Sequence, residues 1–131
     1  MPETFRLPSA IAAALLQQAR ASPTEEICGL IAADARGVTR YFPIANVAAD
    51  RIRRFELDPK GQIDALREMR RRGEELKAIY HSHPRGPAEP SRLDIERHEY
   101  PEAICLVIAL DPPALRAFRI RDKRPQEVVL T

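Results

Sequence analysis

The most informative segment of the sequence is fourteen residues long and reads His81-Ser82-His83-Pro84-Arg85-Gly86-Pro87-Ala88-Glu89-Pro90-Ser91-Arg92-Leu93-Asp94. The segment Leu76 to His83, which overlaps the start of this stretch, has the side-chain alternation that predicts a strand. Side chains two apart on a strand share a face, so His81 and His83 project together from the strand's end. Pro84 ends the strand, a loop rich in Pro and Gly follows, and Ser91 begins a helix.

Outward from this unit, hydrophobic periodicity and turn residues predict helices that alternate with strands. A turn at Asp34 to Gly37 joins the first two strands as a hairpin, and Ser9 is the expected cap of the first helix. We expect helices over 9–22, 59–73 and 91–100, and strands over 27–33, 38–44, 53–57, 76–83, 103–110, 115–120 and 128–130. This order predicts an α+β fold, with a mixed sheet flanked by helices in a single domain over residues 1–131.

Composition excludes several classes of protein. The 131 residues include 21 basic and 19 acidic side chains, so a net charge of +2 gives no field typical of nucleic-acid binding. The longest apolar run, Ala103 to Leu110, is far shorter than the roughly 20 residues of a membrane span. Three His and two Cys exclude a cysteine-rich zinc module and a disulfide scaffold, but not a single metal site.

The N-terminal region imitates a signal peptide, because the apolar run Ala10 to Leu16 precedes the tripeptide Ala19-Arg20-Ala21. A four-residue spacing of apolar positions favours an amphipathic helix instead, at Leu7, Ile11, Leu15 and Ala19. Cys28 and Cys105 lie within apolar runs and are expected to be buried free thiols. We therefore expect a cytoplasmic protein.

The histidine pair and Asp94 suggest a metal site. If the loop folds back, two imidazoles and one carboxylate converge and leave a fourth position open, as in a catalytic zinc site. Zinc in such a site lowers the pKa of a bound water toward about 7. A simpler interpretation stays open for each half of the motif: Ser91 and Asp94 also suit an ordinary helix cap, and histidines are often semi-buried packing residues.

A hydrolytic zinc site also needs a base for the proton of the attacking water. Glu25 and Glu26 offer carboxylates just before the apolar strand that starts at Ile27, although such a pair is often a solvated turn. Gly29 in that strand permits another element or a ligand to approach the backbone closely.

The motif resembles that of the JAMM (MPN-plus) zinc metallopeptidases, written here as His81-x-His83-Pro84-x6-Ser91-x2-Asp94 with Glu26-Ile27-Cys28-Gly29 upstream. The resemblance extends over roughly residues 8 to 121, and the segment Arg54 to Pro59 is similar to the compact prokaryotic branch. It implies a three-layer α/β/α-like fold of MPN and cytidine-deaminase-like architecture. It also implies zinc bound by His81, His83 and Asp94, Glu26 as general base, and Ser91 as hydrogen-bond donor to the oxyanion.

The resemblance further implies cleavage of a peptide or isopeptide bond after the Gly-Gly tail of a ubiquitin-like or sulfur-carrier protein of the β-grasp type, with release of cysteine in some relatives. Such a tail lies extended along a sheet edge, and we expect the segment Arg51 to Leu57 to form that edge. Neither a nucleic acid nor a membrane is expected as a partner. The sequence leaves the oligomeric state open, a homodimer included.

Two other functions compete with a peptidase. A catalytically silent MPN-type scaffold would bind partners without turnover, although such proteins characteristically lose ligands that are present here. A nucleotide deaminase needs H-x-E with P-C-x-x-C, and neither pattern occurs. Iron or cobalt would also accept the ligand set. His98, four residues after Asp94, either supports the metal site or is a packing residue, and the docking of the strand after Pro125 stays open.

Overall fold

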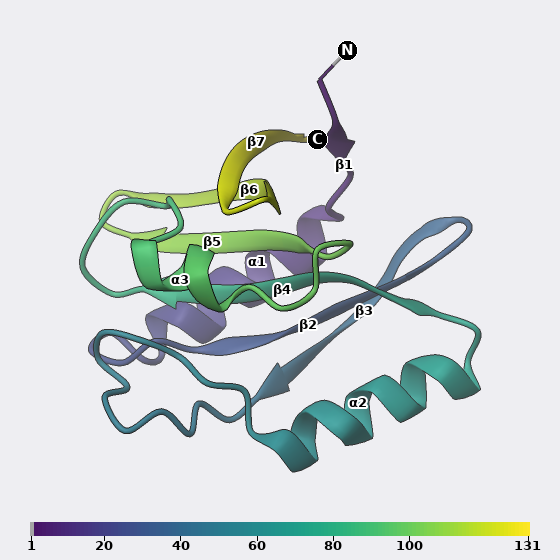
Figure 1. Cartoon of the computed structure of the whole chain (residues 1–131), viewed down its shortest axis with the longest axis horizontal. Helices are drawn as coiled ribbons and strands as arrows, with labels where there is room; N and C mark the ends of the chain where they lie inside the picture. Colours follow the sequence, from purple (N-terminus) through teal and green to yellow (C-terminus); the bar gives the residue numbers. More distant parts are fainter. Residues whose placement is uncertain (1) are drawn as a thin grey trace.

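Seven strands form one mixed sheet in the computed structural model, which describes residues 2–131 (Figure 1). The strand order is β1-β7-β6-β5-β4-β2-β3. Two neighbouring pairs are parallel, β4 with β5 and β1 with β7, and the other pairs are antiparallel. The strands are β1 Thr4–Phe5, β2 Cys28–Asp34, β3 Gly37–Ile44, β4 Glu75–His83, β5 Ile104–Leu110, β6 Pro113–Arg121 and β7 Arg124–Leu130.

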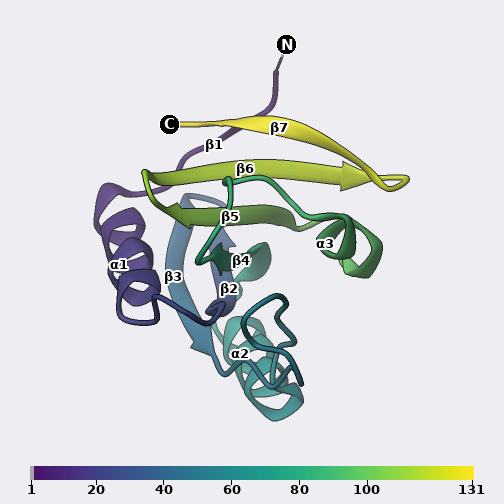
Figure 2. The same cartoon turned by 90° about the vertical axis from the view of Figure 1, so that its left-hand side faces the viewer.

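Three helices cover the two faces of this sheet, and they are α1 Ser9–Arg20, α2 Pro59–Arg71 and α3 Arg92–Arg97. Figure 2 shows α1 on one side of strands β4 and β5 and α3 on the other. The buried clusters agree, since α1 packs on one face while α2 and α3 pack on the opposite face. The predicted α+β fold, a mixed sheet flanked by helices, is confirmed.

Burial explains why these segments form their elements. On α1, Leu15 and Ala19 are fully buried, as the four-residue spacing predicted, and they join a cluster with Tyr80 of β4. On α2, Ala65 and Met69 pack against the other face of the sheet. The central strands β2 and β5 are covered on both faces, so their residues are apolar in nearly continuous runs.

Several predicted boundaries were wrong. Residues 53–57 form no strand: 51–53 lie in a turn, and a single bridge joins Asn46 to Leu57. The helix predicted over 91–100 ends at Arg97, and Ser9 is the first residue of α1 without capping it, since the cap position is Pro8. The two-residue strand β1 was not predicted, because its apolar pattern is too short to be recognised.

The C-terminal strand docks within the chain. β7 pairs with β6 on one side and with β1 on the other, and it starts at Arg124, earlier than predicted. The side chain of Arg119 on β6 binds the Glu3 carboxylate beside β1 and also donates to the Glu102 carbonyl at 2.6 Å. In residues 2–131 no helix combines the length and the apolar character that a membrane crossing requires.

Candidate active site

The site lies where β4 ends between two different neighbours. Strand β5 runs parallel to β4, while β2 runs antiparallel and starts beside the end of β4, with Cys28 opposite His81. Glu26, two residues before Cys28, therefore lies close to His83. His81 is 1% exposed and Glu26 is 5% exposed, so the polar groups meet inside the protein.

Three atoms that can coordinate a metal form a small triangle. The Nε2 atoms of His81 and His83 are 3.1 Å apart, and Oδ2 of Asp94 is 2.9 Å from the first and 3.1 Å from the second. Ligands of tetrahedral zinc at 2.0–2.1 Å from the ion lie about 3.3 Å from one another. The triangle therefore fits a zinc ion with little adjustment, and the ligand set predicted from the sequence converges as expected.

Neighbouring groups orient two of these ligands. Nδ1 of His83 is 3.0 Å from the Pro87 carbonyl oxygen, so Nδ1 carries a proton, and Nε2 offers a lone pair to a metal once its own proton is lost. Oδ2 of Asp94 accepts the Ser91 N–H at 2.8 Å, and the Ser91 hydroxyl oxygen accepts the Asp94 N–H at 3.1 Å. Ser91 and Asp94 thus form a capping box at the start of α3, and the same box aims the carboxylate at the histidines.

The ring of His81 is held by packing. It stacks on Phe55, with centroids 4.5 Å apart and planes at 21°. Its Nδ1 is buried without a hydrogen-bond partner in the described residues. Burial lowers the pKa of His81, which favours the neutral ring that a metal needs. Burial alone would raise the pKa of Asp94, but hydrogen bonds from both histidines hold it well below its usual range.

Glu26 places a buried carboxylate beside the two histidines. One carboxylate oxygen, Oε1, is buried and has no hydrogen-bond partner among residues 2–131. A ligand atom of Glu26 lies within 4.8 Å of ligand atoms of His81 and His83. Burial raises the pKa of Glu26 to about 8, so its ionised carboxylate is a stronger base than that of an ordinary glutamate.

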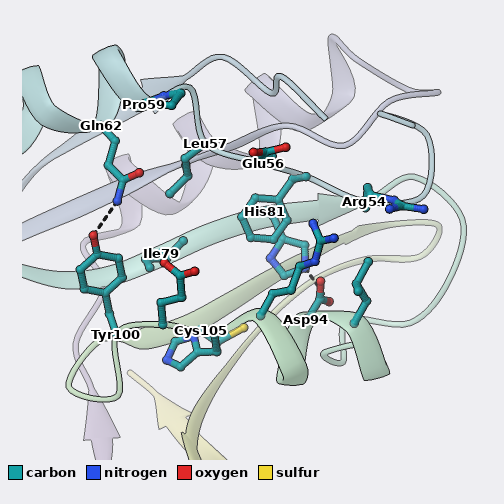
Figure 3. Close-up of a pocket in the computed structure, with 15 residues that line it drawn as sticks. Arg54, Glu56, Leu57, Pro59, Gln62, Ile79, His81, Asp94, Tyr100 and Cys105 are labelled. Atoms are coloured by element: carbon teal, nitrogen blue, oxygen red, sulfur yellow. Dashed lines mark hydrogen bonds and ion pairs between the residues drawn. The ribbon is translucent and has the colours of Figure 1, made fainter. Parts of the chain in front are cut away.

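Two clefts meet at the triangle. Cleft A, about 550 Å³, lies between α2 and α3 and includes His81 and Asp94 in its walls. Figure 3 shows these two side chains toward one end of cleft A and a hydrogen bond of 2.6 Å between Gln62 and Tyr100 at the other. Cleft B, about 660 Å³, includes Glu26, His83 and Ser91 and is bounded by the Pro84–Pro90 loop. A substrate that crosses the triangle has room on both sides.

Sequence reasoning missed two residues that position Glu26. The Ser82 hydroxyl accepts the Ile27 N–H at 2.9 Å, which fastens the residue next to Glu26 to β4. The Asn46 side chain donates to the carbonyls of Glu26 and Arg54 at 2.9 and 3.1 Å and accepts two further N–H groups. Ser82 lay inside the recognised motif and could have been found there, whereas the sequence around Asn46 carried no signal.

The remaining predicted residues are placed as follows. Glu25 is partly exposed and pairs with Arg51 at 3.3 Å, so Glu26 alone of this pair faces the triangle. Both cysteines are buried and free, and burial raises the pKa of each thiol to about 12, which disfavours a nucleophilic thiolate. His98 lies in the wall of cleft A and makes no hydrogen bond to Asp94 within residues 2–131.

The segment Arg51 to Leu57 does not provide the sheet edge expected for a substrate tail. Its backbone groups bond to Asn46 and to the turn around Asp50 instead of presenting an open ladder. Residues 54–57 form one wall of cleft A, so the segment borders the site in a different way from the one predicted.

The sequence and the structure were compared with those of known proteins, and the matches agree with the family that the motif resembles. Residues 8–121 match a family described as prokaryotic homologs of the JAB domain, Prok-JAB. The chain is 37% identical over 95 residues to the desampylase of Haloferax volcanii, which spans 71% of this chain and 68% of the relative. It is 32% identical over 115 residues to the CysO-cysteine peptidase of Mycobacterium tuberculosis, over 83% of this chain and 77% of the relative. A solution structure of a Desulfitobacterium hafniense protein has a TM-score of 0.85 at 28% identity, covering 98% of this chain and 92% of that one.

Proposed function

The chain belongs to the family of prokaryotic homologs of the JAB domain, and we propose that it is a zinc-dependent peptidase acting on the tail of a small carrier protein. Two relatives are named a desampylase and a CysO-cysteine peptidase, which are peptidase activities on protein conjugates. The substrate we propose is a peptide or isopeptide bond after the C-terminal Gly-Gly of a β-grasp ubiquitin-like or sulfur-carrier protein.

The observation that carries this proposal is the convergence of three ligand atoms within 3.1 Å beside a buried carboxylate that lacks a partner. His81, His83 and Asp94 would hold the zinc ion. Bound zinc supplies a water of lowered pKa and polarises the carbonyl of the substrate. The donor set of two neutral imidazoles and one carboxylate with an open position is typical of hydrolytic zinc sites.

The chain's own groups divide the proton transfers between them. Glu26 takes a proton from the attacking water and later delivers it to the leaving nitrogen. A pKa near neutral pH suits both steps, because the group can gain and lose a proton readily. The Ser91 hydroxyl accepts the Asp94 N–H through its oxygen, so its own proton is free to donate to the oxyanion. Both groups face cleft B.

The position of Glu26 orients the substrate. Because the group that protonates the leaving nitrogen lies in cleft B, the leaving group occupies cleft B and the Gly-Gly tail occupies cleft A. Phe55 and the Gln62–Tyr100 pair then border the tail. Two free buried thiols fit a reducing cytoplasm, where we place the protein.

The test combines metal analysis with a cleavage assay on a β-grasp carrier extended past its Gly-Gly tail. We expect one zinc per chain, cleavage after the second Gly by mass spectrometry, and loss of both in His83→Ala. Glu26→Gln should keep the zinc and lose turnover, while the partly exposed neighbour variant Glu25→Gln keeps both. Full activity of Glu26→Gln, or of protein freed of metal by a chelator, contradicts the proposal. Bound zinc without cleavage of any such carrier indicates the scaffold instead.

A further inference from the structure

Two polar side chains from opposite walls meet at the end of cleft A that lies away from the triangle. Gln62 belongs to the first turns of α2, and Tyr100 belongs to the segment between α3 and β5. The Gln62 amide donates to the Tyr100 hydroxyl at 2.6 Å (Figure 3). No other side-chain hydrogen bond or ion pair joins α2 to this segment within residues 2–131, so this pair alone links the two walls through polar groups.

The surface between this pair and the triangle is apolar. Phe55, Leu57 and Ile79 form this part of the cleft wall, and Figure 3 shows Leu57 and Ile79 between the pair and His81. A peptide that lies across this surface loses water from its amide groups, and these side chains offer no hydrogen bond in return. A tail that ends in Gly-Gly also has no side chains there, so its backbone must supply the polar contacts.

The pair retains one unused donor and one unused acceptor. The Tyr100 hydroxyl uses its oxygen to accept the Gln62 amide, so its own proton is free to donate. Oε1 of Gln62 makes no hydrogen bond within residues 2–131. One free donor and one free acceptor, side by side, match the carbonyl and the N–H of a peptide backbone.

Both residues are fixed before any ligand binds. Asp58 caps α2, because its carboxylate accepts the Gly61 N–H at 3.3 Å and its carbonyl accepts the Gln62 N–H at 2.9 Å. The Ala103 N–H donates to the Tyr100 carbonyl at 2.9 Å. The two side chains are half-buried and bonded to each other, so little rotamer freedom is lost when they bind a peptide.

We propose that Gln62 and Tyr100 bind the backbone of the carrier tail, with the Tyr100 hydroxyl donating to a tail carbonyl and Gln62 Oε1 accepting a tail N–H. This inference rests on the proposed function and names the residues that bind the tail in cleft A. The contact lies away from the reacting atoms and is the same before and during the reaction. It therefore strengthens substrate binding and sets KM, while kcat depends on the triangle and Glu26.

The experiment uses the full-length zinc-loaded protein with two probes, a β-grasp carrier extended past Gly-Gly and a synthetic hexapeptide that copies the carrier's last six residues up to Gly-Gly. Tyr100→Phe removes the donor and keeps the ring. It should raise KM for the carrier and Kd for the hexapeptide by roughly threefold to tenfold, the net effect of one neutral hydrogen bond. Gln62→Ala should raise both at least as much, and kcat should change less than about twofold in either variant.

Tyr80→Phe is the matched control. The Tyr80 hydroxyl donates to Gln18 Oε1 at 2.8 Å, so the same substitution removes a tyrosine–glutamine bond on the opposite face of the sheet, beside α1. This variant should keep the wild-type KM and Kd. If Tyr100→Phe also keeps them, or lowers only the melting temperature and kcat, the pair is a structural tie and the inference is overturned. Absence of carrier cleavage by the wild type overturns the proposed function, whereas the hexapeptide Kd still decides whether the pair binds the tail.

Discussion

Replacing Glu26 by Gln should stabilise the metal-free protein, and the gain should grow with pH. Burial raises the pKa of Glu26 to about 8 in the folded chain, from an ordinary value of 4.5. Between these values the unfolded chain has lost the proton while the folded chain keeps it, so the wild type loses stability as pH rises from about 4.5 to about 8. Gln cannot ionise, and the variant avoids this loss.

The magnitude follows from 1.36 kcal/mol for each unit of pKa difference. Between pH 5 and pH 8 the variant should gain about 3 kcal/mol on the wild type in free energy of unfolding, a large part of the 5–15 kcal/mol typical of a domain. Urea denaturation of both chelator-treated proteins at the two pH values measures this difference. The partly exposed variant Glu25→Gln should change by a few tenths of a kcal/mol at either pH. An advantage of Glu26→Gln that is the same at pH 5 and pH 8 refutes the argument from burial.

Three further outcomes are expected from the same geometry. Zinc at a hundred times its Kd should raise the free energy of unfolding by about 2.7 kcal/mol, read as a rise in melting temperature that a chelator reverses. Gly29→Ala should cost about 3 kcal/mol in urea denaturation, because its Cβ would collide with the Tyr80 ring and the Phe42 carbonyl oxygen. Ser82→Ala leaves the partly buried Ile27 N–H without its acceptor, so it should cost about 1 kcal/mol and lower kcat more than it changes zinc content. An unaltered kcat contradicts the positioning role of Ser82.

The convergence of His81, His83 and Asp94 was predictable because the rules that place these residues are local. Two histidines at i and i+2 share a face on any strand, and a Ser-x-x-Asp pair shares a helix start in any fold. The sequence did not show how the loop between the histidine pair and the Ser91–Asp94 pair closes. In the structure the Pro87 carbonyl contacts His83 and the Ala88 side chain packs in an apolar cluster, and both contacts hold the loop in place. The alternative interpretation of Asp94 as a helix cap is compatible with the proposed metal site, since Asp94 both caps α3 and faces the histidines.

The surroundings of the site could not be predicted because they depend on contacts between distant residues. Asn46 takes up the backbone groups of residues 54 and 56, and this removes the strand that the pattern of residues 53–57 favours. The burial of Glu26 depends equally on the register between β2 and β4, in which Cys28 lies opposite His81. A glutamate before a strand has the same local sequence whether it is solvated or buried, and only tertiary packing distinguishes the two.

The architecture of the site makes metal binding and folding interdependent. In the metal-free chain the buried Oε1 of Glu26 and Nδ1 of His81 both lack hydrogen-bond partners among residues 2–131. Each of these features opposes folding, since unpaired buried polar groups are costly. A cation in the triangle favours the ionised form of Glu26, so binding should lower the pKa of the same carboxylate that burial raises. Burial of Glu26 thus causes both the instability of the empty site and the basicity of its carboxylate. A change that exposes Glu26 to solvent would stabilise the metal-free protein and, at the same time, make Glu26 a weaker base.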